Sequence, residues 1–128
     1  MTIARDMADA VFARVATFDN GITEEMTSVT SSSGAATIDL QAGTNFKITL
    51  TEATTFTFSN PPSGNTTSFT LKVVQDASAS GYTVTWPTLN WPSATAPTLT
   101  ATASAVDYFV FIYDGSAWYG FTAGQAMA

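Results

Sequence analysis

Apolar and polar residues alternate one by one from Ala36 onward, and this period of two constrains the fold more than any other feature of the sequence. Residues 36–40, 46–51 and 55–58 each place Ala, Ile, Leu or Phe between Thr, Asp or Lys. A strand turns successive side chains to opposite faces, so runs of this kind are typical of strands with one buried face. The pattern therefore predicts a sheet protein.

Later segments continue the pattern after loop signals at residues 60–65 and 76–81. Residues 106–113 are apolar or aromatic on both faces apart from Asp107, which is typical of a central strand covered on both sides. Asp114-Gly115-Ser116 then predicts a tight hairpin turn. The other predicted strands are residues 69–73, residues 82–86, a short strand at Leu99, and residues 118–121. Seven or eight short strands predict an all-β fold, an antiparallel β-sandwich or jelly roll.

A different pattern precedes the strands. Apolar residues recur there at spacings of three and four, as in an amphipathic helix: Ile3, Met7, Val11, Val15 and Phe18. Residues 27–34 are a Thr/Ser/Gly run with little to bury. We therefore divide the chain into a short N-terminal helical arm, residues 1–34, and a sandwich domain, residues 35–128. The apolar stripe is a candidate interface, docked either on a neighbouring subunit or on its own sheet.

Composition removes most kinds of catalytic chemistry. The 128 residues include no Cys and no His, so the commonest general base and the thiolate and imidazole metal ligands are missing. We expect no catalytic residues, no cofactor and no metal site, and we expect that the chain is not an enzyme.

Charge and hydropathy narrow the partners. Ten acidic residues against four basic ones give a net charge of -6, whereas nucleic-acid binding needs clustered Lys and Arg. No apolar run approaches the roughly 20 residues that cross a bilayer. We expect a soluble protein with no nucleic-acid partner and no membrane partner.

The carboxylates are candidates for hydrolytic chemistry only if two of them converge in a cleft. Asp107 begins the most apolar strand, and a hydrogen bond to a loop backbone is favoured over catalysis there. The segment Asp76 to Gly81 is similar to the start of a calcium loop but lacks the later glutamate, so an ordinary turn is favoured. The other acids of the body fall in turns or face outward, as solvated residues do: Asp39, Glu52 and Asp114.

Aromatic residues form the remaining group of interest. Trp86-Pro87 and Trp91-Pro92 bracket a rigid turn, and Trp118 and Tyr119 follow the hairpin. Exposed flat rings serve sugar sites and protein interfaces alike, although packing at the core is the favoured interpretation. Trp91 and Trp118 are the candidate interface residues of the body.

Several short motifs, taken in order, resemble a module of virion structural proteins from tailed bacteriophages. They are Leu50-Thr-Glu52, Thr55-Phe-Thr-Phe-Ser-Asn-Pro-Pro62, Phe69-Thr-Leu71, Val84-Thr-Trp-Pro87, Trp91-Pro92, Ala96-Pro-Thr-Leu99 and Trp118-Tyr-Gly120. The resemblance implies a non-enzymatic, oligomeric module without a cofactor, found in tail fibres, appendages and capsid-associated proteins. It carries over no binding residue.

One module with a short arm lacks the shaft of a whole fibre. We therefore expect a capsid decoration or cement protein on the outer capsid surface, bound across capsid subunits by apolar and strand-edge contacts. The expected partners are the major capsid protein or other virion proteins, and the expected assembly is a homotrimer. The alternative is a tail-fibre or appendage module that binds a host receptor or glycan.

Overall fold

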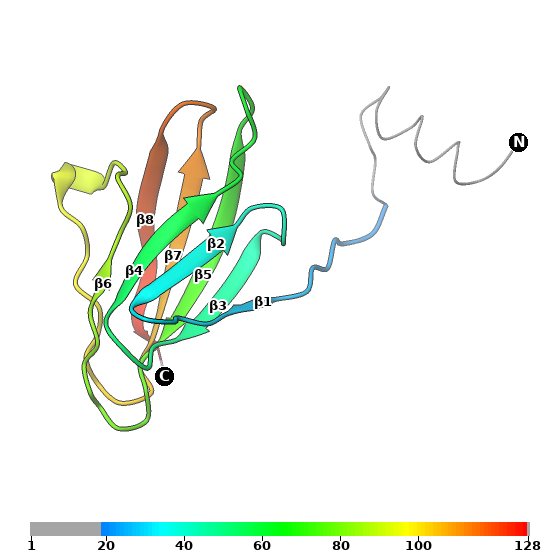
Figure 1. Ribbon diagram of the computed structural model, residues 1–128. Helices are drawn as coiled ribbons and strands as arrows, with labels where there is room; N and C mark the ends of the chain where they lie inside the picture. The colour runs from blue at the N-terminus through cyan, green and yellow to red at the C-terminus, as the bar shows by residue number, and fades with distance from the viewer. Residues whose placement is uncertain (1–18, 128) are drawn as a thin grey trace, which may run out of the picture.

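Two sheets lie face to face in the computed structural model, which describes residues 19–127 (Figure 1). One sheet holds five strands in the order β1 (Thr27–Val29), β3 (Asn45–Thr49), β5 (Thr67–Val74), β7 (Val106–Tyr113) and β8 (Trp118–Met127). The other holds β2 (Ala35–Asp39), β4 (Thr54–Ser59) and β6 (Val84–Thr85). The predicted all-β sandwich is confirmed. The predicted N-terminal helix, residues 3–18, lies outside the described residues.

The direction of strand pairing differs from the antiparallel arrangement that we predicted. β1, β3 and β5 run parallel to one another, as do β2, β4 and β6, while β5 with β7 and β7 with β8 are antiparallel. The physical reason is that the chain crosses to the opposite sheet after each of these early strands. When it returns, it runs in its original direction, and a strand of the other sheet serves as the crossover that parallel pairing requires.

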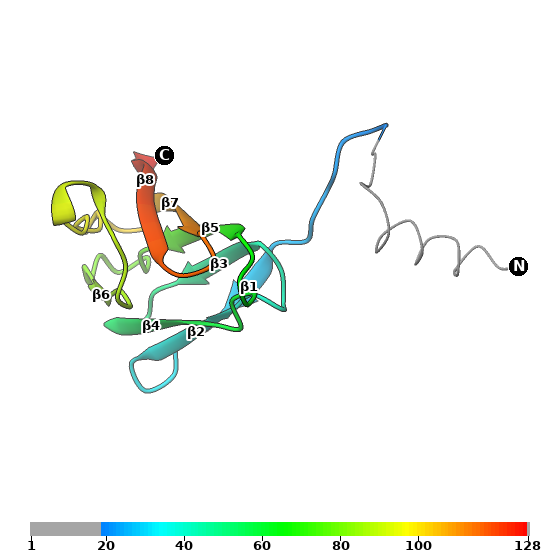
Figure 2. The same cartoon turned by 90° about the horizontal axis from the view of Figure 1, so that it is seen from above.

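The early strands therefore wind as a flattened coil, seen from above in Figure 2. Each turn of the coil has a different length, because Thr27 pairs with Phe46 whereas Thr54 pairs with Val84. Without a constant period, the coil leaves no repeat in the sequence. The last two strands break the alternation between sheets and close the five-stranded sheet with a hairpin.

Some boundaries moved for local reasons. Residues 27–29, which we assigned to the arm, form β1 and pair with β3. The strand predicted over 82–86 shrinks to β6 because the buried Gln75 side chain bonds the backbone of Tyr82, donating to its carbonyl (2.8 Å) and accepting from its N–H (3.1 Å). The prediction of a strand at Leu99 was wrong, since Leu99 packs on the core from a loop.

Aromatic rings fill the space between the sheets. Phe69 and Phe111 stack with centroids 4.9 Å apart, and Phe58 of the smaller sheet meets both rings edge-on at 4.9 Å. Trp86 stacks on Phe56 at 5.2 Å. Such pairs add to the free energy gained by removing the rings from water. The alternating residues therefore turn their apolar members inward on both sheets, as the sequence predicted.

Phe111→Ala should lower the free energy of unfolding by about 3–5 kcal/mol, because the ring is fully buried and its loss leaves a cavity. Ile112→Ala is the matched control, since Ile112 is next to Phe111 in the chain but faces outward and is 40% exposed. This substitution should lower the free energy of unfolding by about 1 kcal/mol or less. Urea denaturation measures both values. Equal losses in the two variants would contradict the assignment of the inner face.

Candidate functional site

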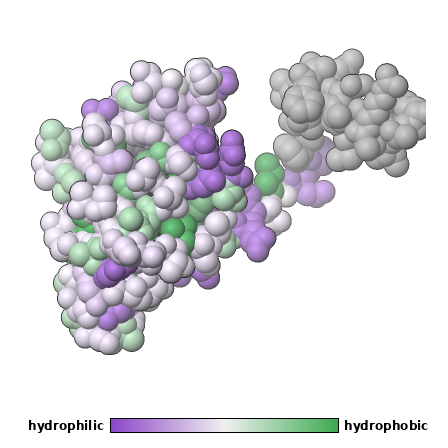
Figure 3. All heavy atoms as spheres, viewed as in Figure 1, coloured by the Kyte–Doolittle hydropathy of each residue, from purple (hydrophilic) through white to green (hydrophobic). Residues whose placement is uncertain are grey.

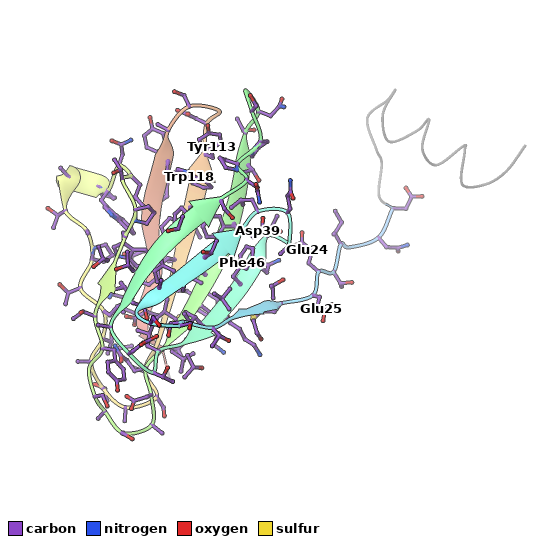
Figure 4. The ribbon with its side chains drawn as sticks, viewed as in Figure 1. Glu24, Glu25, Asp39, Phe46, Tyr113 and Trp118 are labelled. Carbon is purple, nitrogen blue, oxygen red and sulfur yellow. The ribbon has the colours of Figure 1, made fainter. Side chains whose placement is uncertain are left out.

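The indole rings of Trp91 and Trp118 lie half-buried against the core. Trp118 meets Phe58 and Phe69 at centroid distances of 5.1 and 5.5 Å, and Figure 4 shows it beside Tyr113. Trp91 meets Trp86 at 5.5 Å. These contacts agree with core packing, the favoured interpretation of the sequence. Their role at an interface stays a prediction.

Trp91 also closes the edge of β8. A side-chain carbon placed on Gly120 would lie only 2.7 Å from the Trp91 ring, so glycine is what lets the indole approach the strand. Next to it, Asn90 accepts a hydrogen bond from the Gly120 N–H (3.0 Å) and donates its own N–H to the Trp118 carbonyl (2.9 Å). The loop that holds Trp91 is thus fastened to β8 by both ring packing and backbone hydrogen bonds.

Asp107 ties a loop to the end of β8. Its carboxylate is buried and accepts from the N–H of Thr100 (2.8 Å), the hydroxyl of Thr100 (2.9 Å) and the N–H of Ala126 (2.9 Å). The amide of Gln125 adds a longer contact of 3.3 Å. Both oxygens are occupied by donors from two separate segments. This is the predicted hydrogen bonding to a loop backbone, and it gives the carboxylate a structural task.

Three other aspartates cap turns. Asp39 accepts from the Asn60 amide (2.8 Å) and the Gln41 N–H (3.0 Å), Asp76 from the Ser80 N–H (3.0 Å), and Asp114 from the Ala117 N–H (2.7 Å) and the Ser116 N–H. These hydrogen bonds favour the charged carboxylates and lower the pKa of each. Asp76 also accepts from the Ser80 hydroxyl, so its oxygens serve the turn itself.

Metal chemistry finds no support within the part of the chain described. Among residues 19–127, no three acidic side chains gather where they could share an ion, and the sequence holds neither Cys nor His. In the segment Asp76 to Gly81, Ser80 donates from its N–H and its hydroxyl to Asp76, and the preference for a turn over a calcium loop stays a prediction. In the same residues, no helix has the length and apolar character needed to cross a membrane.

An exposed apolar surface lies on the outer side of the last two strands. We call it the β7–β8 apolar face. It consists of Tyr108, Val110 and Ile112 of β7 with Tyr119, Phe121 and Met127 of β8. Ile112 pairs with Tyr119 and Val110 with Phe121 across the two strands, so these side chains share one side of the sheet.

This face remains open to solvent. Ile112, Tyr119, Phe121 and Met127 are 40%, 37%, 42% and 49% exposed. The smaller sheet covers only the inner side, and Figure 2 shows no further layer of residues 19–127 outside β7 and β8. We had predicted that residues 106–113 are covered on both sides. The correction is that β7 has a neighbouring strand on each side, β5 and β8, but is covered on one face only.

A pair of lysines borders the apolar face. Lys47 of β3 lies opposite Lys72 of β5, and Lys72 lies opposite Tyr108, so all three share the outer side of the sheet. Like charges placed directly across two strands repel each other. A negatively charged partner on this side would relieve that repulsion.

The opposite side of the molecule has another character. Figure 3 views the sandwich from the side of β2 and β4, where pale, weakly polar residues cover most of the surface. Thr55 and Thr57 of β4 and Thr37 of β2 are among the exposed residues on that side. The apolar face is therefore one-sided.

Residues 19–26, which we call the strap, extend away from the body beside β1 (Figures 1 and 2). Ile22 is 66% exposed and Met26 is 39% exposed. Glu24 holds the base of the strap, where its carboxylate accepts from the Thr44 hydroxyl and from the Asn45 amide (2.7 Å); Figure 4 shows Glu24 and Glu25 on this segment. Asn45 in turn accepts from the Thr70 hydroxyl of β5 (2.7 Å). The point of departure of the strap is therefore well defined.

Comparison with protein-family models, with curated protein sequences and with solved structures finds no match to this chain. Its candidate site is consequently judged on geometry alone. The strap lies within the arm that we assigned to residues 1–34, whereas the β7–β8 apolar face is a feature that the sequence did not reveal. The available signal was the run of residues 106–113, which is apolar or aromatic on both faces of the strand. Such a run does not distinguish a covered face from an exposed one.

Asp107→Ala should lower the free energy of unfolding by about 1–3 kcal/mol, since it removes the buried acceptor of hydrogen bonds from Thr100 and Ala126, whose donors are only partly buried. Hydrogen exchange should rise at those two amides. The control is Asp114→Ala, which removes a fully exposed turn cap and should leave exchange at Thr100 and Ala126 unchanged. Unaltered exchange at these amides in the Asp107 variant would contradict the assigned role.

The three turn caps predict how stability depends on pH. Their pKa values are lowered in the folded chain, so the unfolded chain takes up protons first as the solution becomes acidic. The stabilisation is complete above the ordinary carboxyl range and is lost as pH falls through the lowered values. Melting temperature should therefore hold steady from neutral pH down to that range and then fall. A variant with Asp39, Asp76 and Asp114 replaced by Asn should fall less steeply; parallel curves would refute this account.

Proposed function

We propose that this chain is a structural protein of a tailed-phage virion, a decoration or cement protein that binds across capsid subunits and stabilises the head. One observation carries the proposal that it binds protein surfaces. A small sandwich exposes a contiguous apolar face on one side and an extended strap with exposed Ile22 and Met26 beside it. Exposed apolar surface of this kind marks protein contact sites.

The buried polar groups support a structural role. Asp107 and Gln75 are buried, and each makes several hydrogen bonds. These hydrogen bonds hold loops next to strands. The assignment to a virion rests on the motifs that resemble phage structural modules, above all Thr55-Phe-Thr-Phe-Ser-Asn-Pro-Pro62 and Val84-Thr-Trp-Pro87. The proposed partners are the major capsid protein or other virion proteins, and the proposed location is the outer capsid surface.

The alternative role, a tail-fibre or appendage module that binds a glycan, would draw on flat aromatic rings at a distal loop. Trp91 and Trp118 are half-buried and packed edge-on against Phe109, Phe58 and other rings. Neither ring lies free as a stacking platform. This packing favours the cement proposal over the glycan-binding one.

The purified chain should bind expanded capsids of its phage and raise their melting temperature in calorimetry, because each bound copy adds apolar contacts that bridge subunits. Deletion of residues 1–20 should weaken both effects. The matched control is Thr57→Asp, a charge on the opposite side of the sandwich. Unchanged capsid stability with saturating protein would overturn the proposal, and specific binding on a glycan array would favour the appendage role instead.

A further inference from the structure

We infer that the β7–β8 apolar face is the receiving site for the N-terminal segment, residues 1–18, of a neighbouring copy of the same chain. The first step is the need for an occupant. Six apolar or aromatic residues from two paired strands share this face, and four of them are at least 37% exposed. The contact concerns copies of this chain only; where it forms, contacts with capsid subunits fall to the rest of the surface, so association of the purified chain tests it separately from capsid binding.

The occupant is identified by what the sequence offers. Residues 1–18 carry Ile3, Met7, Val11, Val15 and Phe18 at helical spacing, which makes one apolar stripe in need of burial. As a helix, the stretch from Ile3 to Phe18 would be about 22 Å long at about 1.5 Å per residue. The face along β7, from Val106 to Ile112, is about 20 Å long at about 3.4 Å per residue. The two apolar surfaces therefore match in length.

Charge supports the same pairing. The strap that follows the stripe carries Asp19, Glu24 and Glu25 and no basic residue, whereas Lys47 and Lys72 border the apolar face on its sheet. A strap laid along this border of the neighbouring copy would set Asp19, which lies farther along the strap than the anchored Glu24, near the two lysines. Complementary charges of this kind fix the orientation of a contact more than its strength.

The direction of the strap indicates a neighbouring copy. It leaves the body at the β1 edge of the five-stranded sheet, four strands away from β8, and points outward on the side of the outer face without lying on it (Figures 1 and 2). Ile22 remains 66% exposed, as expected of a segment that reaches away from its own body. A copy that gives its N-terminal segment and receives another makes a head-to-tail contact, which closes as a reciprocal dimer or a ring.

The cysteine-free sequence allows a direct test by disulfide formation in the full-length chain. Chains with Met7→Cys are mixed with chains carrying Phe121→Cys under mild oxidation, and the products are separated without reductant. We expect the mixed disulfide between the two kinds of chain. The control partner is Thr57→Cys, an exposed position on β4, which should yield at least about tenfold less mixed product.

Association is measured in parallel by light scattering on the wild type, on a chain lacking residues 1–18, and on Phe121→Asp. Both changes should raise the concentration for half-association by about tenfold or more, while melting temperature shows that each variant still folds. Thr57→Asp should associate as the wild type does.

Three results would overturn the inference. The first is equal mixed disulfide with the Thr57→Cys partner. The second comes from a chain that carries both Met7→Cys and Phe121→Cys. A disulfide formed only within that single chain would place the N-terminal segment on its own body. The third is that the chain lacking residues 1–18 associates as the wild type does, which would mean that the sheet of a second copy occupies the face.

Discussion

Burial of phenylalanine rings between the two sheets is the interaction on which the rest of the structure depends. The first six strands make no hairpins, so each parallel pair joins segments that are far apart in the chain and must overcome the entropy of closing a long loop. No short turn between paired strands offsets this loss of entropy. The stabilising free energy is gained only when rings such as Phe56, Phe69 and Phe111 pack between the two sheets. The coil and its core therefore form together.

A run that is apolar on both faces located β7, and alternation was sufficient to locate β2, β3, β4 and β5, because alternation reports which side chains point inward. Alternation does not report which strands are neighbours in a sheet, so the parallel pairing could not be predicted from it. β8 runs on to Met127 through Gly124 and Ala126, residues that give no pattern. The structural use of Asp107 was predictable because a lone acid in an apolar strand must find donors, whereas the open side of β7 was not predictable from residues that are apolar on both sides.

The polar residues divide into two groups with separate tasks. Asp107 and Gln75 are buried, and each holds a loop where a regular strand ladder is absent. Asp39, Asp76 and Asp114 lie at corners of the surface and shape individual turns. The surfaces left over are sheet faces whose charged residues are the lysines Lys47 and Lys72, and an acidic strap, so the net charge of -6 resides chiefly in turns and in the segment leading to the sandwich.

Parallel winding has a consequence for how such a chain can vary. In a hairpin, the length and type of the turn set the register of the two strands, so an added residue shifts every side chain to the opposite face. In the coil, register is set instead by rings that meet between layers, and the corner at residues 61–66 carries the chain across, whereas Gln75 and Asp76 hold the corner at residues 75–83 in place. The corner at residues 61–66 can therefore lengthen or shorten while the strands keep their partners, and new surface features can arise there without any change in the core.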